Sequence, residues 1–301
     1  MAQGARFLPR AEVLSIAELE AVAGAFIARG VTKLRITGGE PLVRPDCMAL
    51  MERLGRFLGQ GLEELTLTTN GTLLTRYAEQ LAVAGVRRVN VSLDTLDPVL
   101  FAQVARRAAL PQVLQGIAAA QGAGLQVKLN TVALKGVNEA DIPRLIRWAH
   151  GQGMDITLIE VMPLGEVEAD RQDQFLPLTA MRERLEREFT FRPAIHATGG
   201  PARYFEVAET GGRLGLISPL TQNFCAGCNR VRVTCTGQLY PCLGGAERID
   251  LRAALRGPAP QAALDTALEQ AMRIKPERHR FEDALTGGTA AVARTMAVTG
   301  G

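Results

Sequence analysis

Short runs of β-forming residues alternate with helical stretches between residues 16 and 161, and this alternation constrains the fold more than any other feature. Ser15 and Glu18 form a capping-box pattern that opens a helix ending at Gly30. We expect strands at 33–37, 65–68, 88–93, 126–134 and 156–161, with helices at 46–58, before residue 85, at 111–122 and at 140–151. Helices between successive strands are typical of a parallel sheet with right-handed crossovers, so we predict an α/β fold.

The pattern changes after about residue 200, where two short strands at 204–207 and 213–217 predict an antiparallel hairpin. A cysteine-containing segment follows, and then helices near 250–256 and 260–272. We therefore divide the chain into residues 1–200, which form the sheet, and residues 201–301, which form a C-terminal region.

Composition excludes several classes of protein. Hydrophobic residues make up 47% of the 301 residues, which is enough for a large core. Aromatic residues make up only 5%, and the net charge of +3 is too small to predict DNA binding, so we expect no nucleic-acid partner. No apolar run reaches the ~20 residues that a membrane-spanning helix needs. We expect a soluble cytoplasmic protein that binds no membrane, with a charge that suits a small phosphorylated ligand.

Three cysteines in the last third indicate a metal site. Two residues separate Cys225 from Cys228, and thirteen residues separate Cys228 from Cys242. Three thiolates leave one coordination position open, which suits an iron–sulfur cluster with an exchangeable corner or zinc with an outside ligand. A structural zinc knuckle is the alternative at this point. Arg230 and Arg232 lie in the same segment, and two cations beside a metal site favour an anionic ligand.

The turns that follow the expected strands carry glycine and small polar residues. These turns are 38–41, 68–71, 92–94, 130–131 and 160–163. In parallel β/α barrels the ligand binds where the strands end, so this edge of the sheet predicts a ligand cavity.

The segment Thr37-Gly38-Gly39-Glu40-Pro41 resembles the Gly-Gly-Glu element of radical S-adenosylmethionine enzymes, whose fold is a partial (β/α)6 barrel. The Cys-x-x-Cys-Asn-Arg-x-Arg segment at 225–232, Cys242 and the final Gly-Gly extend the match. With them the chain is similar to the GTP 3′,8-cyclase family of molybdenum cofactor biosynthesis, from about Phe7 to its last residue. The resemblance implies radical cyclisation of GTP to 3′,8-cyclo-7,8-dihydro-GTP.

The resemblance also implies a role for individual residues. A 4Fe–4S cluster would be held by Cys225, Cys228 and Cys242. Residues implied to bind S-adenosylmethionine are Gly38, Gly39, Glu40, Ser92 and Met162. Those implied to bind GTP are Arg35, Thr68, Lys128, Arg230 and Arg232, and the implied catalytic set is Arg230, Arg232, Lys128, Gly300 and Gly301, with the last two reaching the active site. The implied partners are GTP, the next enzyme of the molybdopterin pathway and a reductant protein, with a homodimer as a further expectation.

Two features depart from the family pattern. Members carry three cysteines in a C-x3-C-x2-C loop after an N-terminal strand, and these hold the 4Fe–4S cluster that reduces S-adenosylmethionine. This sequence has no cysteine before Cys47. We therefore expect an incomplete radical-SAM barrel whose first strand and second-cluster ligands are absent. A chain that is truncated or mis-started at its N-terminus explains this, and a degenerate paralogue is the alternative. Thr157 stands where the family often has an arginine.

Two other hypotheses remain open. The chain could be a non-catalytic nucleotide-binding protein with one three-cysteine metal site, of iron or zinc. It could also be a radical-SAM enzyme that acts on a peptide and carries an auxiliary cluster. Metal content and GTP binding distinguish these hypotheses.

Overall fold

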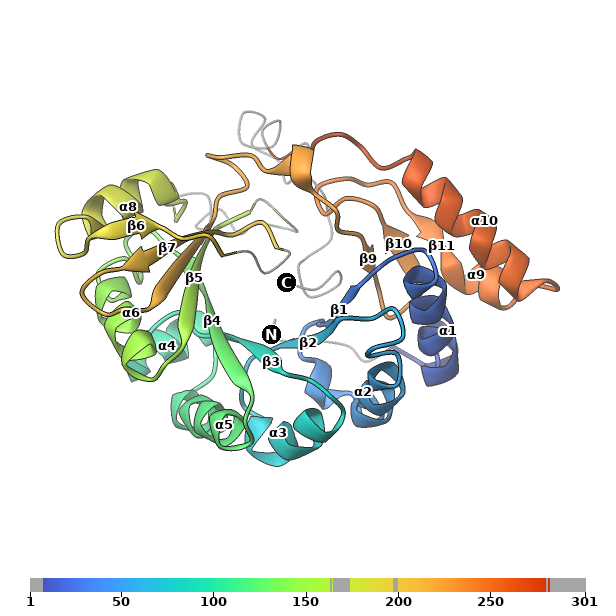
Figure 1. The fold of residues 1–301 in the computed structure, drawn as a ribbon, viewed down its shortest axis with the longest axis horizontal. Helices are drawn as coiled ribbons and strands as arrows, with labels where there is room; N and C mark the ends of the chain where they lie inside the picture. The colour runs from blue at the N-terminus through green and yellow to red at the C-terminus, as the bar shows by residue number, and fades with distance from the viewer. Residues whose placement is uncertain (1–7, 163, 165–173, 197–199, 280, 282–301) are drawn as a thin grey trace.

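The computed structural model describes residues 8–162, 164, 174–196, 200–279 and 281 (Figure 1). Its main sheet has eight strands in the order β1-β2-β3-β4-β5-β8-β7-β6. Six of them are parallel: β1 (Lys33–Ile36), β2 (Glu64–Thr69), β3 (Arg88–Ser92), β4 (Gln126–Ala133), β5 (Asp155–Glu160) and β8 (Arg213–Ile217). In the described residues β1 forms one edge of this sheet, so the barrel they form is partial and open.

Helices cover the outer side of the curved sheet (Figure 1). The capping box is confirmed, because the Ser15 hydroxyl accepts the Glu18 N–H and the Glu18 carboxylate accepts the Ser15 N–H. The helices are α1 (Ile16–Ile27), α2 (Cys47–Gly55), α3 (Leu74–Val83), α4 (Pro98–Ala105), α5 (Leu110–Gly122), α6 (Ile142–Gly151), α8 (Leu178–Leu185), α9 (Leu251–Leu255) and α10 (Pro260–Arg273). The expected helices and strands are confirmed, while α4 and α8 were not placed by the sequence pattern.

The predicted hairpin is confirmed, since β7 (Arg203–Val207) pairs antiparallel with β8, and β6 (Phe191–Pro193) extends it. Strand β8 also pairs in parallel with β5. The main sheet therefore contains strands from both sides of residue 200, and the division of the chain at that residue stays a prediction. A second sheet holds β9 (Arg232–Val233), β10 (Gln238–Tyr240) and β11 (Ile249–Asp250).

Side chains on the parallel strands alternate between two environments. The apolar positions are buried against the helices and form the main core, which includes Leu67, Val89, Leu129, Ile156 and Leu214. The positions between them face away from the helices, and we call that side of the sheet its inner face. Burial of the apolar set, at ~25 cal/mol per Å² of apolar area removed from water, is the main force that closes the sheet against its helices.

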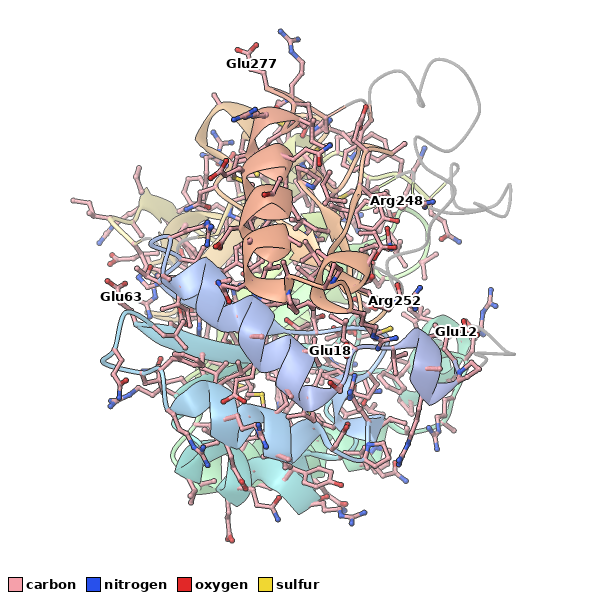
Figure 2. The ribbon with its side chains drawn as sticks, turned by 90° about the vertical axis from the view of Figure 1, so that its right-hand side faces the viewer. Glu12, Glu18, Glu63, Arg248, Arg252 and Glu277 are labelled. Atoms are coloured by element: carbon pink, nitrogen blue, oxygen red, sulfur yellow. The ribbon has the colours of Figure 1, made fainter. Side chains whose placement is uncertain are left out.

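A second core joins the C-terminal region to α1. Val22, Ala25 and Phe26 of α1 pack in it with residues of α9 and α10, whereas Ala23 and Ile27 of the same helix belong to the main core. Figure 2 faces this side of the molecule, where α10 lies against α1. Helix α1 therefore lies between the two cores and contributes residues to both.

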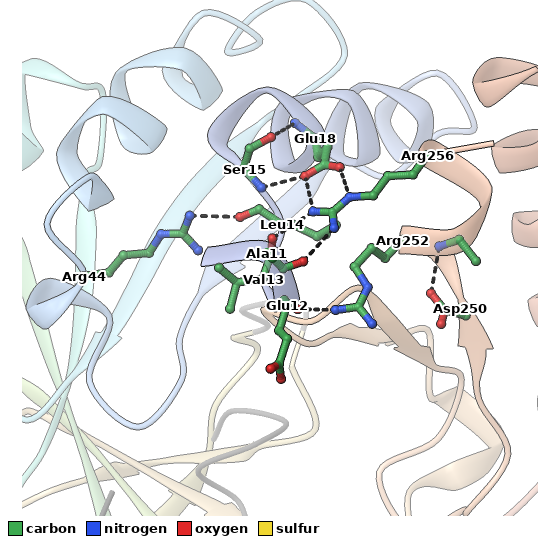
Figure 3. A network of polar contacts seen from close by, with 11 residues as sticks. Ala11, Glu12, Val13, Leu14, Ser15, Glu18, Arg44, Asp250, Arg252 and Arg256 are labelled. Carbon is green, nitrogen blue, oxygen red and sulfur yellow. Dashed lines mark hydrogen bonds and ion pairs between the residues drawn. The ribbon is translucent and has the colours of Figure 1, made fainter. Parts of the chain in front are cut away.

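Residues 9–14, which precede α1 and which we call the N-terminal strap, are held by arginines from distant segments (Figure 3). Arg256 donates to the carbonyls of Ala11 and Val13, at 2.7 and 3.0 Å, and Arg252 donates to that of Glu12. Arg44, from the turn after β1, donates to the Leu14 carbonyl at 3.0 Å. The strap thus links the end of β1 to the C-terminal region.

No helix in the described residues is long and apolar enough to cross a membrane.

Candidate active site

The inner face of the sheet is polar. Thr68, Asn90 and Lys128 stand side by side on β2, β3 and β4, and Asn130 and Thr157 are neighbours on β4 and β5. Parallel sheets covered by helices are ordinarily apolar on both faces. A row of polar side chains on this face therefore indicates that it receives a polar ligand.

Four buried polar atoms on consecutive strands have no hydrogen-bond partner in the described structure. They are the hydroxyl oxygens of Thr68 and Thr157 and the amide oxygens of Asn90 and Asn130. Buried polar groups are nearly always paired, because an unpaired one loses its hydration without replacement. These four atoms favour a ligand that carries hydrogen-bond donors.

Four cations lie around the same face. Lys128 is only 7% exposed, and burial lowers the pKa of its ammonium group. Arg35 is exposed, yet desolvation by the surrounding protein and the nearby charges of Arg88 and Arg230 lower its pKa. The pKa of Arg232 falls to about 10, because it is desolvated by burial and stands close to Arg230 and Arg35.

The structure thus brings together the predicted residues Arg35, Lys128, Arg230 and Arg232. These like charges repel one another, so a bound anion would stabilise the group electrostatically. The arginine forks suit phosphate oxygens, which accept two parallel N–H bonds. A polyanionic ligand with donor groups elsewhere in its structure would satisfy both the cations and the unpaired oxygens.

The Gly-Gly-Glu turn closes the carboxyl end of β1. Glu40 is buried, and its carboxylate accepts from Leu42 N–H at 3.1 Å, Thr69 hydroxyl at 2.8 Å and Asn70 N–H at 2.7 Å. Burial raises the pKa of Glu40, and these hydrogen bonds oppose that rise. Gly38 has a φ of +152°, in the region that favours glycine, and Gly39 is exposed. Glu40 therefore ties the ends of β1 and β2 together, and its predicted contact with S-adenosylmethionine stays a prediction.

A pocket of about 460 Å³ opens at the ends of β2 and β3. Ser92 lines it together with Asn70, Asp94 and Arg106. Burial raises the pKa of Asp94 to about 6, against a hydrogen bond from the Val132 N–H at 2.8 Å. Met162 lies half-buried just beyond β5. The sequence pattern marked this edge as polar but did not single out Asp94, because the N–H that its carboxylate accepts comes from β4, 38 residues away.

The three predicted cluster ligands lie in the C-terminal region, and none of them forms a disulfide in the described residues. Burial raises the pKa of Cys228, but the N–H and charge of Arg230 and the charge of Lys275 together lower it by more. The net shift of the pKa is therefore downward. Lys275 donates to the carbonyls of Arg230 and Pro241, at 2.9 and 2.8 Å, and so joins the two cysteine segments. Thiolates stabilised by cations suit an iron–sulfur cluster.

The positions of the thiols are less conclusive than their chemistry. Within the described residues, no three His, Cys, Asp or Glu side chains lie close enough to hold one metal ion. The geometry therefore leaves the set of Cys225, Cys228 and Cys242 as a prediction. Gly300 and Gly301 lie outside the described residues.

Comparison with known proteins gives matches along almost the whole chain. Residues 2–149 match the model of the Radical SAM superfamily, and residues 154–281 match that of Molybdenum Cofactor Synthesis C. The chain is 63% identical to the GTP 3′,8-cyclase of Erythrobacter litoralis over 301 residues, which are 90% of that protein. It is 56% identical to the GTP 3′,8-cyclase of Rhizobium etli, of which it covers 86%.

Solved structures support the fold alone. Streptococcus suis SuiB bound to S-adenosylmethionine aligns with a TM-score of 0.59 at 16% identity, over 98% of this chain and 72% of SuiB. The structure of anSMEcpe with bound AdoMet aligns with a TM-score of 0.53 at 13% identity, over 83% of this chain and 74% of that protein.

Proposed function

This chain belongs to the GTP 3′,8-cyclase family of radical S-adenosylmethionine enzymes, and we propose that it converts GTP to 3′,8-cyclo-7,8-dihydro-GTP in molybdenum cofactor synthesis. The observation that carries the substrate is the polar inner face, where four cations surround four unpaired oxygens. GTP has a triphosphate for the cations and hydroxyl, amino and imino donors for the oxygens.

In this proposal Arg230, Arg232 and Arg35 bind the triphosphate through bidentate hydrogen bonds, and Lys128 adds a point charge. The hydroxyl of Thr68 accepts a donor of the nucleoside. Such contacts hold the ribose and the base in one orientation and keep bulk water away from the reacting atoms. The contribution of these residues to catalysis is then orientation and electrostatic stabilisation.

Members of this family use a 4Fe–4S cluster and S-adenosylmethionine. Here Cys225, Cys228 and Cys242 would hold a cluster, and Gly38, Gly39, Glu40, Ser92 and Met162 would contact S-adenosylmethionine. When bound, a three-thiolate cluster supplies an iron with one position open to a ligand. Because no cysteine precedes Cys47 in this sequence, the residues present form no ligand set for a second cluster. The partner proteins, the homodimer and the cytoplasmic location stay predictions.

The binding test replaces both arginines of the cysteine segment. In protein reconstituted with iron and sulfide, Arg230→Ala with Arg232→Ala should weaken GTP binding at least ~100-fold, because each lost charge-assisted hydrogen bond is worth ~1.5–3 kcal/mol. Equilibrium binding of labelled GTP gives the measurement, and the exposed Arg192→Ala on β6 is the matched control. Unchanged affinity in the double variant would contradict the proposed substrate.

Metal analysis separates the cyclase from the alternatives. About four iron and four sulfide per chain, lost in Cys228→Ser, agree with a 4Fe–4S cluster. One zinc per chain would favour the zinc knuckle. GTP bound without any product by the protein isolated from its native source, supplied with S-adenosylmethionine and a reductant, would favour the non-catalytic nucleotide-binding protein.

A further inference from the structure

Lys128 is a buried cation without an acidic partner in the described structure. Its side chain lies on the inner face of β4, 7% exposed, and it forms no ion pair there. Its hydrogen-bond partner is the phenol oxygen of Tyr204, to which Nζ donates at 3.1 Å. Nζ also lies 5.8 Å from the centre of the Tyr204 ring. Burying a charged ammonium group away from water costs free energy, so the contact with Tyr204 affects whether Lys128 keeps its proton.

The backbone explains how Tyr204 reaches this lysine from another part of the sheet. Tyr204 on β7 pairs with Gly215 on β8, and Gly215 pairs with Thr157 on β5. A Cβ atom at residue 215 would lie 2.9 Å from the Tyr204 ring and 2.9 Å from the Thr157 hydroxyl. The tyrosine ring therefore covers Gly215, where a larger side chain would displace it.

The ring is fixed from its other side as well. Tyr204 is only 4% exposed, and His196 packs edge-on against it with the ring centres 4.7 Å apart. The ring is thus packed on two sides, and its oxygen lies within hydrogen-bond distance of Lys128 Nζ. The hairpin β7–β8 thereby places the Tyr204 phenol oxygen in the site, although the hairpin is not part of the alternating strands and helices.

We propose that Tyr204 is a positioning residue that holds the Lys128 ammonium group toward the phosphates of the bound nucleotide. The phenol oxygen accepts one N–H of the ammonium and leaves its other N–H groups for phosphate oxygens. This inference rests on the proposed function, and it adds to the site a residue from the hairpin.

The charges around Lys128 predict how pH acts on this contact. Burial lowers the pKa of Lys128, Arg88 on β3 and Arg35 on β1 lower it further, and Tyr204 on β7 raises it. Two further titratable groups are packed here, His196 beside Tyr204 and Asp155, the register neighbour of Lys128 on β5, which pairs with Arg213 at 2.9 Å. Burial and the charge of Arg213 lower the pKa of His196, and Asp155 raises it. Removal of the phenol oxygen should therefore lower the pKa of Lys128, so that the lysine loses its proton, and the nucleotide its contact, at a lower pH.

Tyr204→Phe tests the proposal, because it keeps the ring that packs on Gly215 and removes only the oxygen. In the reconstituted full chain we expect about tenfold weaker GTP binding near neutral pH, as for a lost hydrogen bond to a charged group. GTP binding should weaken at alkaline pH as Lys128 loses its proton, and in Tyr204→Phe this weakening should begin at a lower pH than in the wild type. Tyr77→Phe, on α3 beside Arg76, is the matched control and should change neither value.

A double-variant cycle separates positioning from a general structural effect. Lys128→Met should remove the alkaline limb, and Tyr204→Phe added to it should cause little further loss. Full additivity of the two changes, or an unshifted alkaline limb in Tyr204→Phe, would overturn the proposal. Inorganic tripolyphosphate serves as a second ligand, and Tyr204→Phe should weaken its binding as much as that of GTP. If the wild type binds tripolyphosphate but not GTP, the proposed substrate fails while the role of Tyr204 is still tested.

Discussion

At the scale of single residues, the unpaired oxygens of the inner face make a prediction about stability. The Thr157 hydroxyl is fully buried without a partner, so Thr157→Val should stabilise the ligand-free protein by about 1 kcal/mol. Thr131 is the matched control, since it is equally buried on a neighbouring strand but donates to the Leu93 carbonyl at 2.7 Å. Thr131→Val should destabilise by about 1 kcal/mol. Urea unfolding of both variants measures the difference, and equal losses would show that the Thr157 hydroxyl is paired after all.

The same scale shows which parts of the site a sequence can reveal. Arg35 and Lys128 are charges inside otherwise apolar strand patterns, so their residue type alone signals a partner or ligand. Arg230 and Arg232 are marked by the cysteines beside them. Tyr204 carries no such signal, because its role depends on the pairing of β7 with β8 and on the missing side chain at Gly215. A contact made through strand register cannot be read from local pattern.

At the scale of elements, helix α5 packs against α3 and the turn after β2 through a glycine. A Cβ atom at Gly116 would lie 2.1 Å from the Gly71 carbonyl oxygen, whereas one at Gly122 in the same helix would meet nothing within 4 Å. Gly116→Ala should destabilise by about 1–3 kcal/mol, because backbone cannot move aside as a side chain can. Gly122→Ala should stabilise by up to about 1 kcal/mol through helix propensity. The unfolding free energies of the pair check this, and a stabilised Gly116→Ala would disprove the close contact.

The elements also show where sequence patterns stop being informative. The capping box at Ser15 and Glu18 and the apolar strands β2 to β5 depend on neighbours in sequence, and their positions were predicted. Strands β6 and β9 to β11 have only two or three residues, too few to show a period. The hairpin was predicted, but the addition of β8 beside β5 was not, since the choice of partner strand is a long-range property.

At the scale of the whole molecule, two cores share α1, and the partners of this helix come from opposite ends of the chain. Arg256, just after α9, donates to the Glu18 carboxylate in α1 at 2.7 Å and also to the N-terminal strap. The C-terminal region, with its cysteines, is therefore held to the barrel in part by charge as well as by apolar packing. The sequence showed the capping role of Glu18 but not this second partner, 238 residues away.

This arrangement makes the union of the two cores sensitive to acid. The hydrogen bond from Arg256 lowers the pKa of Glu18 from 4.5 to about 2, burial opposes that shift, and the Ser15 N–H adds to it. Because the pKa in the folded state lies below the ordinary value, the stabilisation is complete above pH 4.5 and is lost as the pH falls toward 2. Solvent reaches this pair, with 19% of the Glu18 side chain exposed, so we expect about 1 kcal/mol from it at neutral pH.

Glu18→Gln isolates the charge, since glutamine can still complete the capping box. Its free energy of unfolding should be about 1 kcal/mol below that of the wild type at neutral pH, and the two should converge in acid. Glu188→Gln is the control, because Glu188 pairs with Arg147 at 2.8 Å with both side chains 44–50% exposed, and it should change little at either pH. If the free energy of unfolding of Glu18→Gln stays below that of the wild type by the same amount in acid, then packing, rather than charge, holds α1 between the two cores.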